Sequence, residues 1–285
     1  MKHILHIIIL IVFTSSITAS AQEVSTSYGV SAQAGHSLQI NGIDLYYESY
    51  GEGDPLLLIH GNGQSIGSMA AQIEYFSASY NVIIADTRGH GKSEMGEGVL
   101  TYEQITEDLM GLLDHLKIGS VPIIGWSDGG VVGLHIASKY PSRVNKLVTY
   151  GANTYAGGAS VYPWLIQMLK GLDANIVDGL KKEPNSADLL HQKQLNDLMM
   201  QMTPITPAML QRITAPTLIM AGDKDAITNR HTIEIFEQIP NAHLAIMPGQ
   251  THLMPVTNPK AFNKVAADFL KMPFKRPTTK AAFLQ

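Results

Sequence analysis

A serine set between glycines divides an apolar run from a helix-like segment near the middle of this 285-residue chain. The pentapeptide Gly125-Trp126-Ser127-Asp128-Gly129 follows the apolar residues 121–124 and opens a segment with helical periodicity. A strand, a sharp turn and a helix are what a nucleophile elbow requires, and glycines beside the serine leave room for the turn. The pattern therefore predicts a serine hydroxyl raised above the carboxyl end of a strand.

A chance serine in a glycine-rich turn would leave the same five residues, so the rest of the chain decides between the two interpretations. A nucleophilic serine needs a base, a carboxylate that orients the base, and donors for the oxyanion. Downstream, one apolar run ends in a turn containing Asp223 and Asp225, and a later one is followed by His252. An acid and a base are thus expected at the ends of two later strands, with the choice between the two acids left open.

The oxyanion donors are expected in a second glycine-rich turn, where the apolar residues 56–59 lead into His60-Gly61-Asn62-Gly63. With serine, aspartate and histidine in this chain order, residues 37 to 271 resemble the α/β-hydrolase family. The resemblance implies that Ser127 is the nucleophile, Asp225 the acid and His252 the base. It also implies an oxyanion hole made by the backbone N–H groups of Asn62 and Asp128.

A shorter stretch carries a narrower resemblance. Gly-Trp-Ser-Asp-Gly-Gly at 125–130, together with residues 139–141 and 150–153, is similar to biphenyl-hydrolase-like, valacyclovir-hydrolase-type amino-acid-ester hydrolases. This implies that Asp128 reads a substrate ammonium group, and we expect Trp126 and Trp164 to contact the substrate as well. The alternative is that Asp128 caps the helix that follows, where the helix dipole favours an acid.

The N-terminal residues have the form of a targeting segment. Lys2 and His3 precede the apolar residues 4–13, and Ala19-Ser20-Ala21 has the small-x-small form of a cleavage site. We expect a signal peptide at 1–21 and export to the periplasm or beyond, with an uncleaved anchor as the alternative. The chain has no cysteine, so neither disulfides nor a lipid-modified cysteine can hold the exported protein.

The remaining length suits one large domain with an insertion. Asn41-Gly42 between alternating residues predicts a hairpin, and continuous apolar runs indicate strands buried on both faces. The fold class is therefore α/β, with a doubly wound, mostly parallel sheet. The predicted strands lie at 55–60, 81–86, 121–125, 146–151, 216–222 and 242–247, and the predicted helices at 66–77, 101–116, 128–140, 229–238 and 259–270.

These elements divide the chain into a core at 37–152 and 214–271, a flexible lead-in at 22–36 and a tail at 272–285. Residues 153–213 lack strand character and are too long for a bare loop, so we expect a helical cap over the serine. Five methionines in the cap either line its underside or pack its own core: Met168, Met199, Met200, Met202 and Met209.

Other motifs fail on their spacing. The glycines at 61, 63 and 67 imitate a dinucleotide fingerprint, but the third glycine comes one residue late. No paired-histidine zinc motif occurs, and acyl transfer through a serine requires no cofactor or metal. A formal net charge of −4 argues against nucleic acid as a partner.

The sequence therefore predicts an exported serine hydrolase that cleaves small carboxylic esters, with amino-acid esters as the narrower class. The alternatives that keep the triad are a lactonase, a carbon–carbon bond hydrolase and an aminopeptidase. A non-catalytic ligand-binding protein on the same scaffold is the alternative from another class, because a fold does not fix a function.

Overall fold

The computed structural model describes residues 28–277 and residue 279. The predicted signal peptide at 1–21, residues 22–27 of the lead-in, and residues 278 and 280–285 of the tail lie outside the described residues. The strands are β1 (Gly35–Ile40), β2 (Ile43–Tyr50), β3 (Pro55–Ile59), β4 (Asn81–Ala85), β5 (Val121–Trp126), β6 (Val144–Tyr150), β7 (Thr217–Lys224) and β8 (Ala242–Thr251).

The helices of the core are α1 (Ala70–Phe76), α2 (Tyr102–His115), α3 (Asp128–Lys139), α7 (Asn229–Gln238) and α9 (Pro259–Lys271), with short helical turns at α6 (Pro207–Leu210) and α8 (Met254–Thr257). A 3₁₀ turn at Ile66–Met69 precedes α1, and another follows α3 at Pro141–Arg143. Each core strand and helix predicted from the sequence is present, with ends that differ by a few residues.

The strands form one sheet in the order β1-β2-β4-β3-β5-β6-β7-β8. The Asn41-Gly42 turn, in which both residues have positive φ, joins β1 and β2 as an antiparallel hairpin. β2 also runs antiparallel to β4, and all further neighbours are parallel. The predicted α/β class with a doubly wound, mostly parallel sheet is confirmed.

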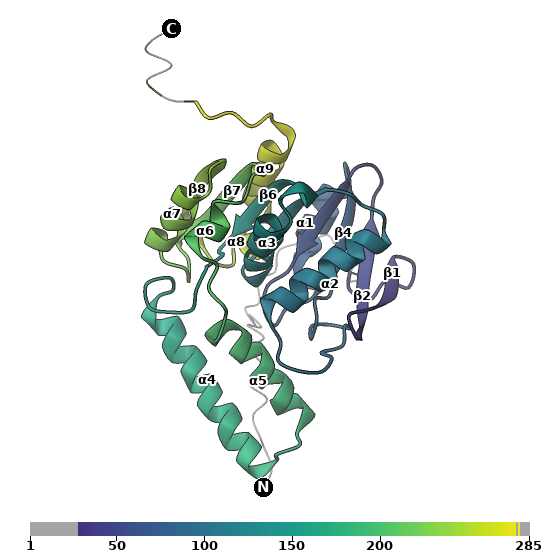
Figure 1. Ribbon diagram of the computed structural model, residues 1–285, viewed down its shortest axis with the longest axis vertical. Helices are drawn as coiled ribbons and strands as arrows, with labels where there is room; N and C mark the ends of the chain where they lie inside the picture. Colours follow the sequence, from purple (N-terminus) through teal and green to yellow (C-terminus); the bar gives the residue numbers. More distant parts are fainter. Residues whose placement is uncertain (1–27, 278, 280–285) are drawn as a thin grey trace, which may run out of the picture.

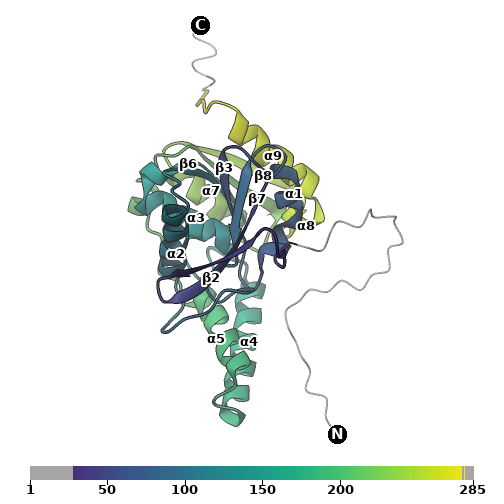
Figure 2. The same ribbon diagram turned by 90° about the vertical axis from the view of Figure 1, so that its right-hand side faces the viewer.

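Alternate side chains of the central strands enter two separate cores. On β3, Leu57 and Ile59 pack with α2 and α3, whereas Leu56 and Leu58 pack with α1 and α9. Figure 2 shows α2 and α3 on one side of the strands and α1, α8 and α9 on the other. Burial on both faces explains why the strands read as continuous apolar runs.

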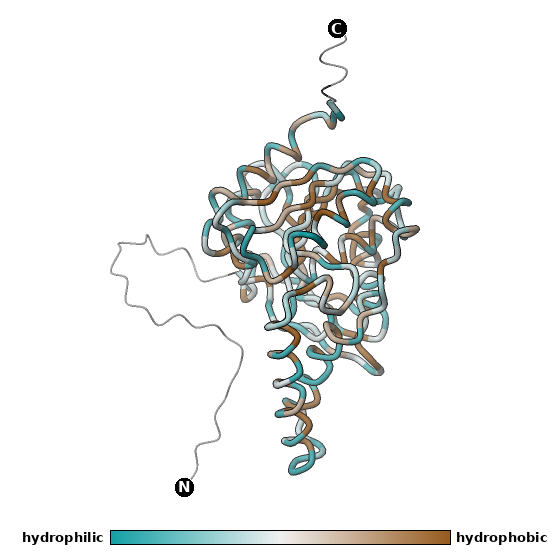
Figure 3. The backbone as a smooth tube through the Cα atoms, turned by 90° about the vertical axis from the view of Figure 1, so that its left-hand side faces the viewer, coloured by the Kyte–Doolittle hydropathy of each residue, from teal (hydrophilic) through white to brown (hydrophobic). Residues whose placement is uncertain are grey.

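The segment expected to form the cap contains two long helices, α4 (Pro163–Lys182) and α5 (Ala187–Met200), which extend from the body as a helical hairpin (Figure 1). Apolar and polar residues alternate along this hairpin, whereas apolar stretches run through the middle of the body (Figure 3). Only Leu169 and Ile176 of α4 are buried. Within residues 28–277 no helix is long and apolar enough to cross a membrane.

The described part of the lead-in differs from the flexible segment that was expected. The fully buried carboxylate of Glu48 on β2 accepts hydrogen bonds from the backbone N–H groups of Gly29 and Ser31, at 2.7 and 3.0 Å. The hydroxyls of Tyr46 and Tyr50 donate to the same carboxylate at 2.7 Å. Four donors offset the cost of burying this carboxylate, and the chain is tied to the sheet from residue 29 onward.

Candidate active site

Ser127 lies directly after β5, at the turn into α3. Its φ of 56° and ψ of −122° place it where L side chains are rarely found, at a cost of about 1–3 kcal/mol. A Cβ on Gly125 would collide with the Gly129 carbonyl, and one on Gly129 would collide with the carbonyl of Ile59. The two glycines therefore let α3 approach β3 and β5 closely enough to form the elbow.

β7 and β8 reach further toward this edge of the sheet than the sequence predicts. Lys224 at the end of β7 pairs with Thr251 at the end of β8, after a shift in register. Gly222 permits this approach, because a Cβ at that position would collide with the backbone of β8. The extension brings the loop that carries Asp225 next to the loop that carries His252.

Ser127, His252 and Asp225 form a continuous chain of hydrogen bonds. The Oγ of Ser127 lies 2.9 Å from Nε2 of His252, and Nδ1 of His252 lies 2.6 Å from Oδ1 of Asp225. An ionised carboxylate can only accept, so Nδ1 carries the proton and Nε2 can accept from the serine hydroxyl. This arrangement can remove the serine proton as its oxygen attacks a carbonyl carbon.

The two aspartates at the end of β7 have different partners. Asp225 is 3% exposed, and its carboxylate also accepts from the backbone N–H of Ile227, at 3.0 Å. Asp223 accepts from the backbone N–H of Gly249, at 2.7 Å. Of the two acids that the residues alone left open, the structure brings Asp225 to the imidazole of His252.

Two buried aromatic side chains fix the backbone beside the imidazole. The indole N–H of Trp126 donates to the carbonyl of His252 at 2.9 Å, and the hydroxyl of Tyr150 donates to that of Thr251 at 2.6 Å. Trp126 is 2% exposed and packs in the core between the sheet, α1 and α9. The expectation that Trp126 contacts the substrate is therefore wrong, because the strand turns this side chain away from the cavity.

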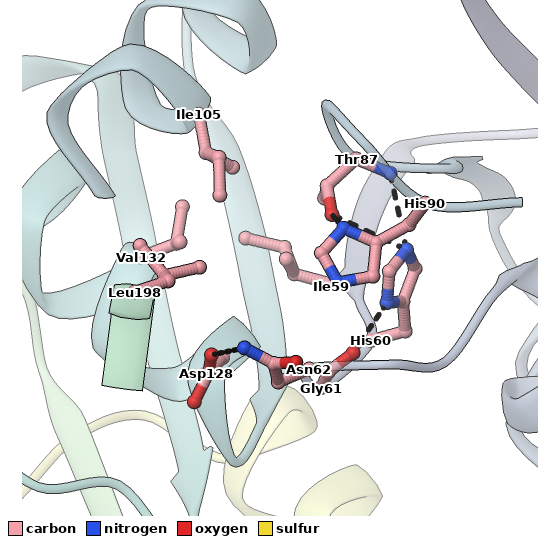
Figure 4. A pocket seen from close by; sticks show the side chains of 10 residues that line it. All are labelled: Ile59, His60, Gly61, Asn62, Thr87, His90, Ile105, Asp128, Val132 and Leu198. Carbon is pink, nitrogen blue, oxygen red and sulfur yellow. Dashed lines mark hydrogen bonds between the residues drawn. The ribbon is translucent and has the colours of Figure 1, made fainter. Parts of the chain in front are cut away.

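The turn after β3 lies against the turn that carries Ser127. Figure 4 shows Asn62 of the first turn beside Asp128, which follows Ser127. A Cβ on Gly61 would lie 3.0 Å from the Cβ of Ser127. His60 donates through Nδ1 to the Gly61 carbonyl at 2.8 Å and accepts through Nε2 from the backbone N–H of Thr87 at 3.1 Å. Burial lowers the pKa of His60 to about 4, so this neutral tautomer holds the turn in place at ordinary pH.

Asp128 lies next to Ser127 and is held by two uncharged side chains. Asn62 donates through Nδ2 to Oδ2 of Asp128 at 3.0 Å, and the Tyr102 hydroxyl is a second donor. Burial raises the pKa of the Asp128 carboxyl, while these donors and the nearby charge of His252 oppose that shift. Its hydrogen-bond partners among the described residues are side chains rather than amides of α3, so no capping hydrogen bond is present. Asp128 is nevertheless the acid in the first turn of α3, where the helix dipole favours a negative charge.

A cavity of about 760 Å³ opens over Ser127, between the carboxyl edge of the sheet and the cap. This size suits a small molecule. Trp164, 55% exposed, lines the cavity as expected, together with Met168, Met199 and Met200 of the cap and the side chains of Asp128 and His252. Met202 and Met209 instead join the main core. The walls are mostly apolar. Asp128 and His252 lie beside the serine, and Lys170 of α4 and Lys224 at the end of β7 also line the cavity.

The pH dependence of turnover follows from the carboxylates around His252. Burial lowers the pKa of the imidazole, but Asp225 and then Asp128 outweigh burial and raise the pKa above its ordinary value of 6.5. Because the base must be neutral, we expect kcat/KM to fall as the pH drops through a midpoint above 6.5.

Asp128→Asn removes one of the two carboxylate charges and should move that midpoint to lower pH. The measurement is the pH profile of kcat/KM for both proteins on a neutral ester. A midpoint that stays in place in the variant would show that the Asp128 charge does not act on His252.

Three contacts of the site could not be assigned from the sequence. Tyr102 comes from the start of α2 and reaches Asp128. Gly151, with φ of 64°, leaves room for His252, because a Cβ there would lie 2.7 Å from the imidazole. The Asn62 side chain adds a contact to a residue for which only the backbone N–H had a predicted role. An alignment of homologues could mark a fixed glycine or tyrosine here, but a single sequence cannot.

Comparison with known proteins agrees with the architecture. Residues 54–182 match the family model described as "alpha/beta hydrolase fold". Serine hydrolase BPHL of Mus musculus is 30% identical over 81% of this chain and 84% of its own length. 3-Oxoadipate enol-lactonase 2 of Acinetobacter baylyi is 27% identical over 82% of this chain and 96% of its own.

Among solved structures, the enol-lactonase from Burkholderia xenovorans LB400 superposes with a TM-score of 0.68 at 23% identity, covering 83% of this chain and all of that one. At that identity the superposition speaks for the fold alone. The family match and the identity to the mouse relative over most of both chains go further. The chain belongs to the α/β-hydrolase family.

Proposed function

We propose that this protein is an exported serine hydrolase that cleaves small carboxylic esters through an acyl-enzyme intermediate. The observation that carries the proposal is the hydrogen-bonded chain from Ser127 through His252 to Asp225, at 2.9 and 2.6 Å. It opens into a cavity large enough for a small molecule and mostly apolar in its walls. The partner of the site is therefore a small-molecule, ester-type substrate.

The reaction runs in two halves. His252 takes the proton of Ser127 while the serine oxygen bonds to the carbonyl carbon, and Asp225 stabilises the imidazolium. The backbone N–H groups of Asn62 and Asp128 donate to the oxyanion, and one such donor contributes about 3 kcal/mol. The carbon–oxygen bond to the alcohol then breaks, and His252 gives the proton to that alcohol. Water repeats the sequence and releases the carboxylic acid and the free serine.

The narrower substrate class is an ester with an ammonium group close to the acyl carbon. The carboxylate of Asp128 lies beside Ser127 and accepts hydrogen bonds from uncharged side chains. His252 is the group whose positive charge interacts with this carboxylate. No lysine or arginine within residues 28–277 forms an ion pair with Asp128, so a substrate cation can supply the missing opposite charge. The apolar walls fit the remainder of a small amino-acid ester.

Asp128→Asn should abolish a preference for aminoacyl esters. We expect wild-type protein to hydrolyse alanine methyl ester with a kcat/KM at least about tenfold above that for methyl propionate, its des-amino analogue. The variant should lose that ratio and keep most of its activity on the propionate. If the ratio of the two kcat/KM values stays the same, whether activity on both esters is kept or lost equally, Asp128 has no part in substrate recognition.

Hydrolysis of a lactone is the second candidate, because the chain is 27% identical to an enol-lactonase along nearly all of that relative. The same triad could open a ring ester, since the acyl chemistry is shared. Turnover of a panel of esters, lactones, vinylogous diketones and aminoacyl amides decides among these substrates. Ester turnover well above that of the other classes supports the proposal, and a preference for another class replaces it.

Export rests on the N-terminal sequence alone. The basic and apolar residues that precede Ala19-Ser20-Ala21 have the order of a signal peptide. Mature protein purified from cells that express the full chain should begin at Gln22, as N-terminal sequencing or intact mass can show. Protein that keeps Met1 and stays in the cytoplasm would refute export and leave the proposed chemistry untouched.

A further inference from the structure

The side chain of Asn62 forms hydrogen bonds both to the residue that follows Ser127 and to the cap. Its Nδ2 donates to Oδ2 of Asp128 at 3.0 Å and to the backbone carbonyl of Leu195 on α5, also at 3.0 Å. A carboxamide nitrogen carries two N–H groups about 120° apart, so one can go to each acceptor. Both partners can only accept, which fixes the orientation of the amide, and Figure 4 shows Asn62 pointing toward Asp128.

The other hydrogen bonds between α5 and the core reach the segment that connects β4 to α2. Gln194 accepts from the backbone N–H of Leu100 and donates to the carbonyl of Gly98, both at 2.9 Å. His191 lies 2.6 Å from the carbonyl of Gly89 through Nε2. Among the described residues, Asn62 is thus the one side chain that hydrogen-bonds both α5 and a residue adjacent to Ser127.

The backbone of Asn62 has little freedom of its own. The preceding Gly61 donates through its N–H to Oε1 of Gln64 at 2.9 Å, and its carbonyl accepts from the neutral ring of His60. A displacement of α5 must therefore be taken up by the Asn62 side chain and the carboxylate that it holds, rather than by the turn as a whole.

We infer that Asn62 is a positioning residue that couples the seating of the cap to the orientation of the Asp128 carboxylate. This inference rests on the proposed function, in which Asp128 reads a substrate ammonium group. With α5 seated, the two N–H groups of Asn62 hold the carboxylate in one orientation beside the nucleophile. With α5 displaced, Asp128 loses an aligned donor, and recognition of the ammonium group weakens while the triad stays intact.

The first test is a double-mutant cycle on alanine methyl ester. Asn62→Ala keeps the backbone N–H and should lower kcat/KM about tenfold, because it removes a hydrogen bond to a charged group. In the Asp128→Asn background the same change should cost less than about twofold, since its target is gone. Asn62→Asp, nearly the same shape but without donors, should match or exceed the loss in Asn62→Ala, which guards against a misplaced turn in the smaller variant.

Gln194→Ala is the matched variant, because it loosens the same helix without touching Asp128. If the seating of α5 acts through Asp128, its loss of kcat/KM on alanine methyl ester should also shrink in the Asp128→Asn background. Hydrogen–deuterium exchange of residues 190–200 should be faster in both Asn62→Ala and Gln194→Ala than in wild type, with β5 unchanged. The inference would be overturned if the losses from Asn62→Ala and Asp128→Asn multiplied in the double variant. It would also be overturned if Gln194→Ala alone accelerated the hydrogen exchange of α5.

The two proposals fail separately. If wild-type protein does not prefer the alanine ester, the narrower substrate class fails, and the exchange of α5 in Asn62→Ala still decides whether Asn62 ties down the cap. If the preference is present and Asn62→Ala changes neither the ratio nor the exchange, Asn62 fails as a positioning residue while the substrate class stands.

Discussion

Ser127→Ala is expected to lower kcat/KM for ester hydrolysis by about a thousandfold or more, and His252→Ala by a similar factor. The Ser127 oxygen forms the bond to the acyl group, and the imidazole 2.9 Å away carries the proton in both halves of the reaction. Serine and histidine act as one unit, so the loss of either disables both. The double variant should therefore be about as active as the less active of the two single variants.

A histidine elsewhere on β8 supplies the control. His243 lies at the start of the strand, where its ring contacts those of Phe269 and Phe274 with centroids 6.2 and 4.6 Å apart. His243→Ala should keep turnover within about threefold of wild type, consistent with a site away from the reacting atoms. The measurement is hydrolysis of p-nitrophenyl acetate by folded proteins, with folding checked by circular dichroism. More than a tenth of wild-type activity in Ser127→Ala or His252→Ala would refute the assignment.

Asp225→Asn is expected to lower kcat by about four orders of magnitude, whereas Asp223→Asn should change it by less than about threefold. The carboxylate of Asp225 lies 2.6 Å from Nδ1 of His252, and an amide there would favour the wrong tautomer of the imidazole. Asp223 accepts instead from the backbone N–H of Gly249 on β8. Each variant replaces one carboxylate oxygen by an amide nitrogen, so each is the control for the other.

The measurement is kcat at a pH above the midpoint of the acid limb, so that protonation of the base does not mask the difference. Equal losses in the two variants would mean that the turn, rather than one carboxylate, supports the histidine. A larger loss in Asp223→Asn would transfer the role of the acid to that residue.

The sequence was sufficient for the features that depend on local pattern. Continuous apolar strands, alternating with helices, predict the doubly wound sheet, and Asn41-Gly42 predicts its antiparallel hairpin. The elbow at Ser127 is equally local, because glycines at 125 and 129 are needed for its turn. The approach of Asp225 and His252 follows from strand ends that meet at one edge of the sheet.

The remaining features depend on packing, which a single sequence does not encode locally. Trp126 is a residue type often found in substrate contacts. Side chains along β5 point alternately to the two faces of the sheet, and this alternation directs Trp126 into the core. The extension of β7 and β8 depends on a close backbone approach at Gly222. The neighbours of Asp128 come from the turn after β3 and from α2, so neither Asn62 nor Tyr102 could be assigned to it from the sequence.

Labelling with a fluorophosphonate tests the central claim most directly, because this reagent requires a serine activated by a base and does not depend on the natural substrate. Wild-type protein should gain the mass of one adduct, and peptide mapping should place it on Ser127. Ser127→Ala should gain none, and His252→Ala should react far more slowly. An unlabelled wild-type protein, or an adduct on another residue, would contradict the account.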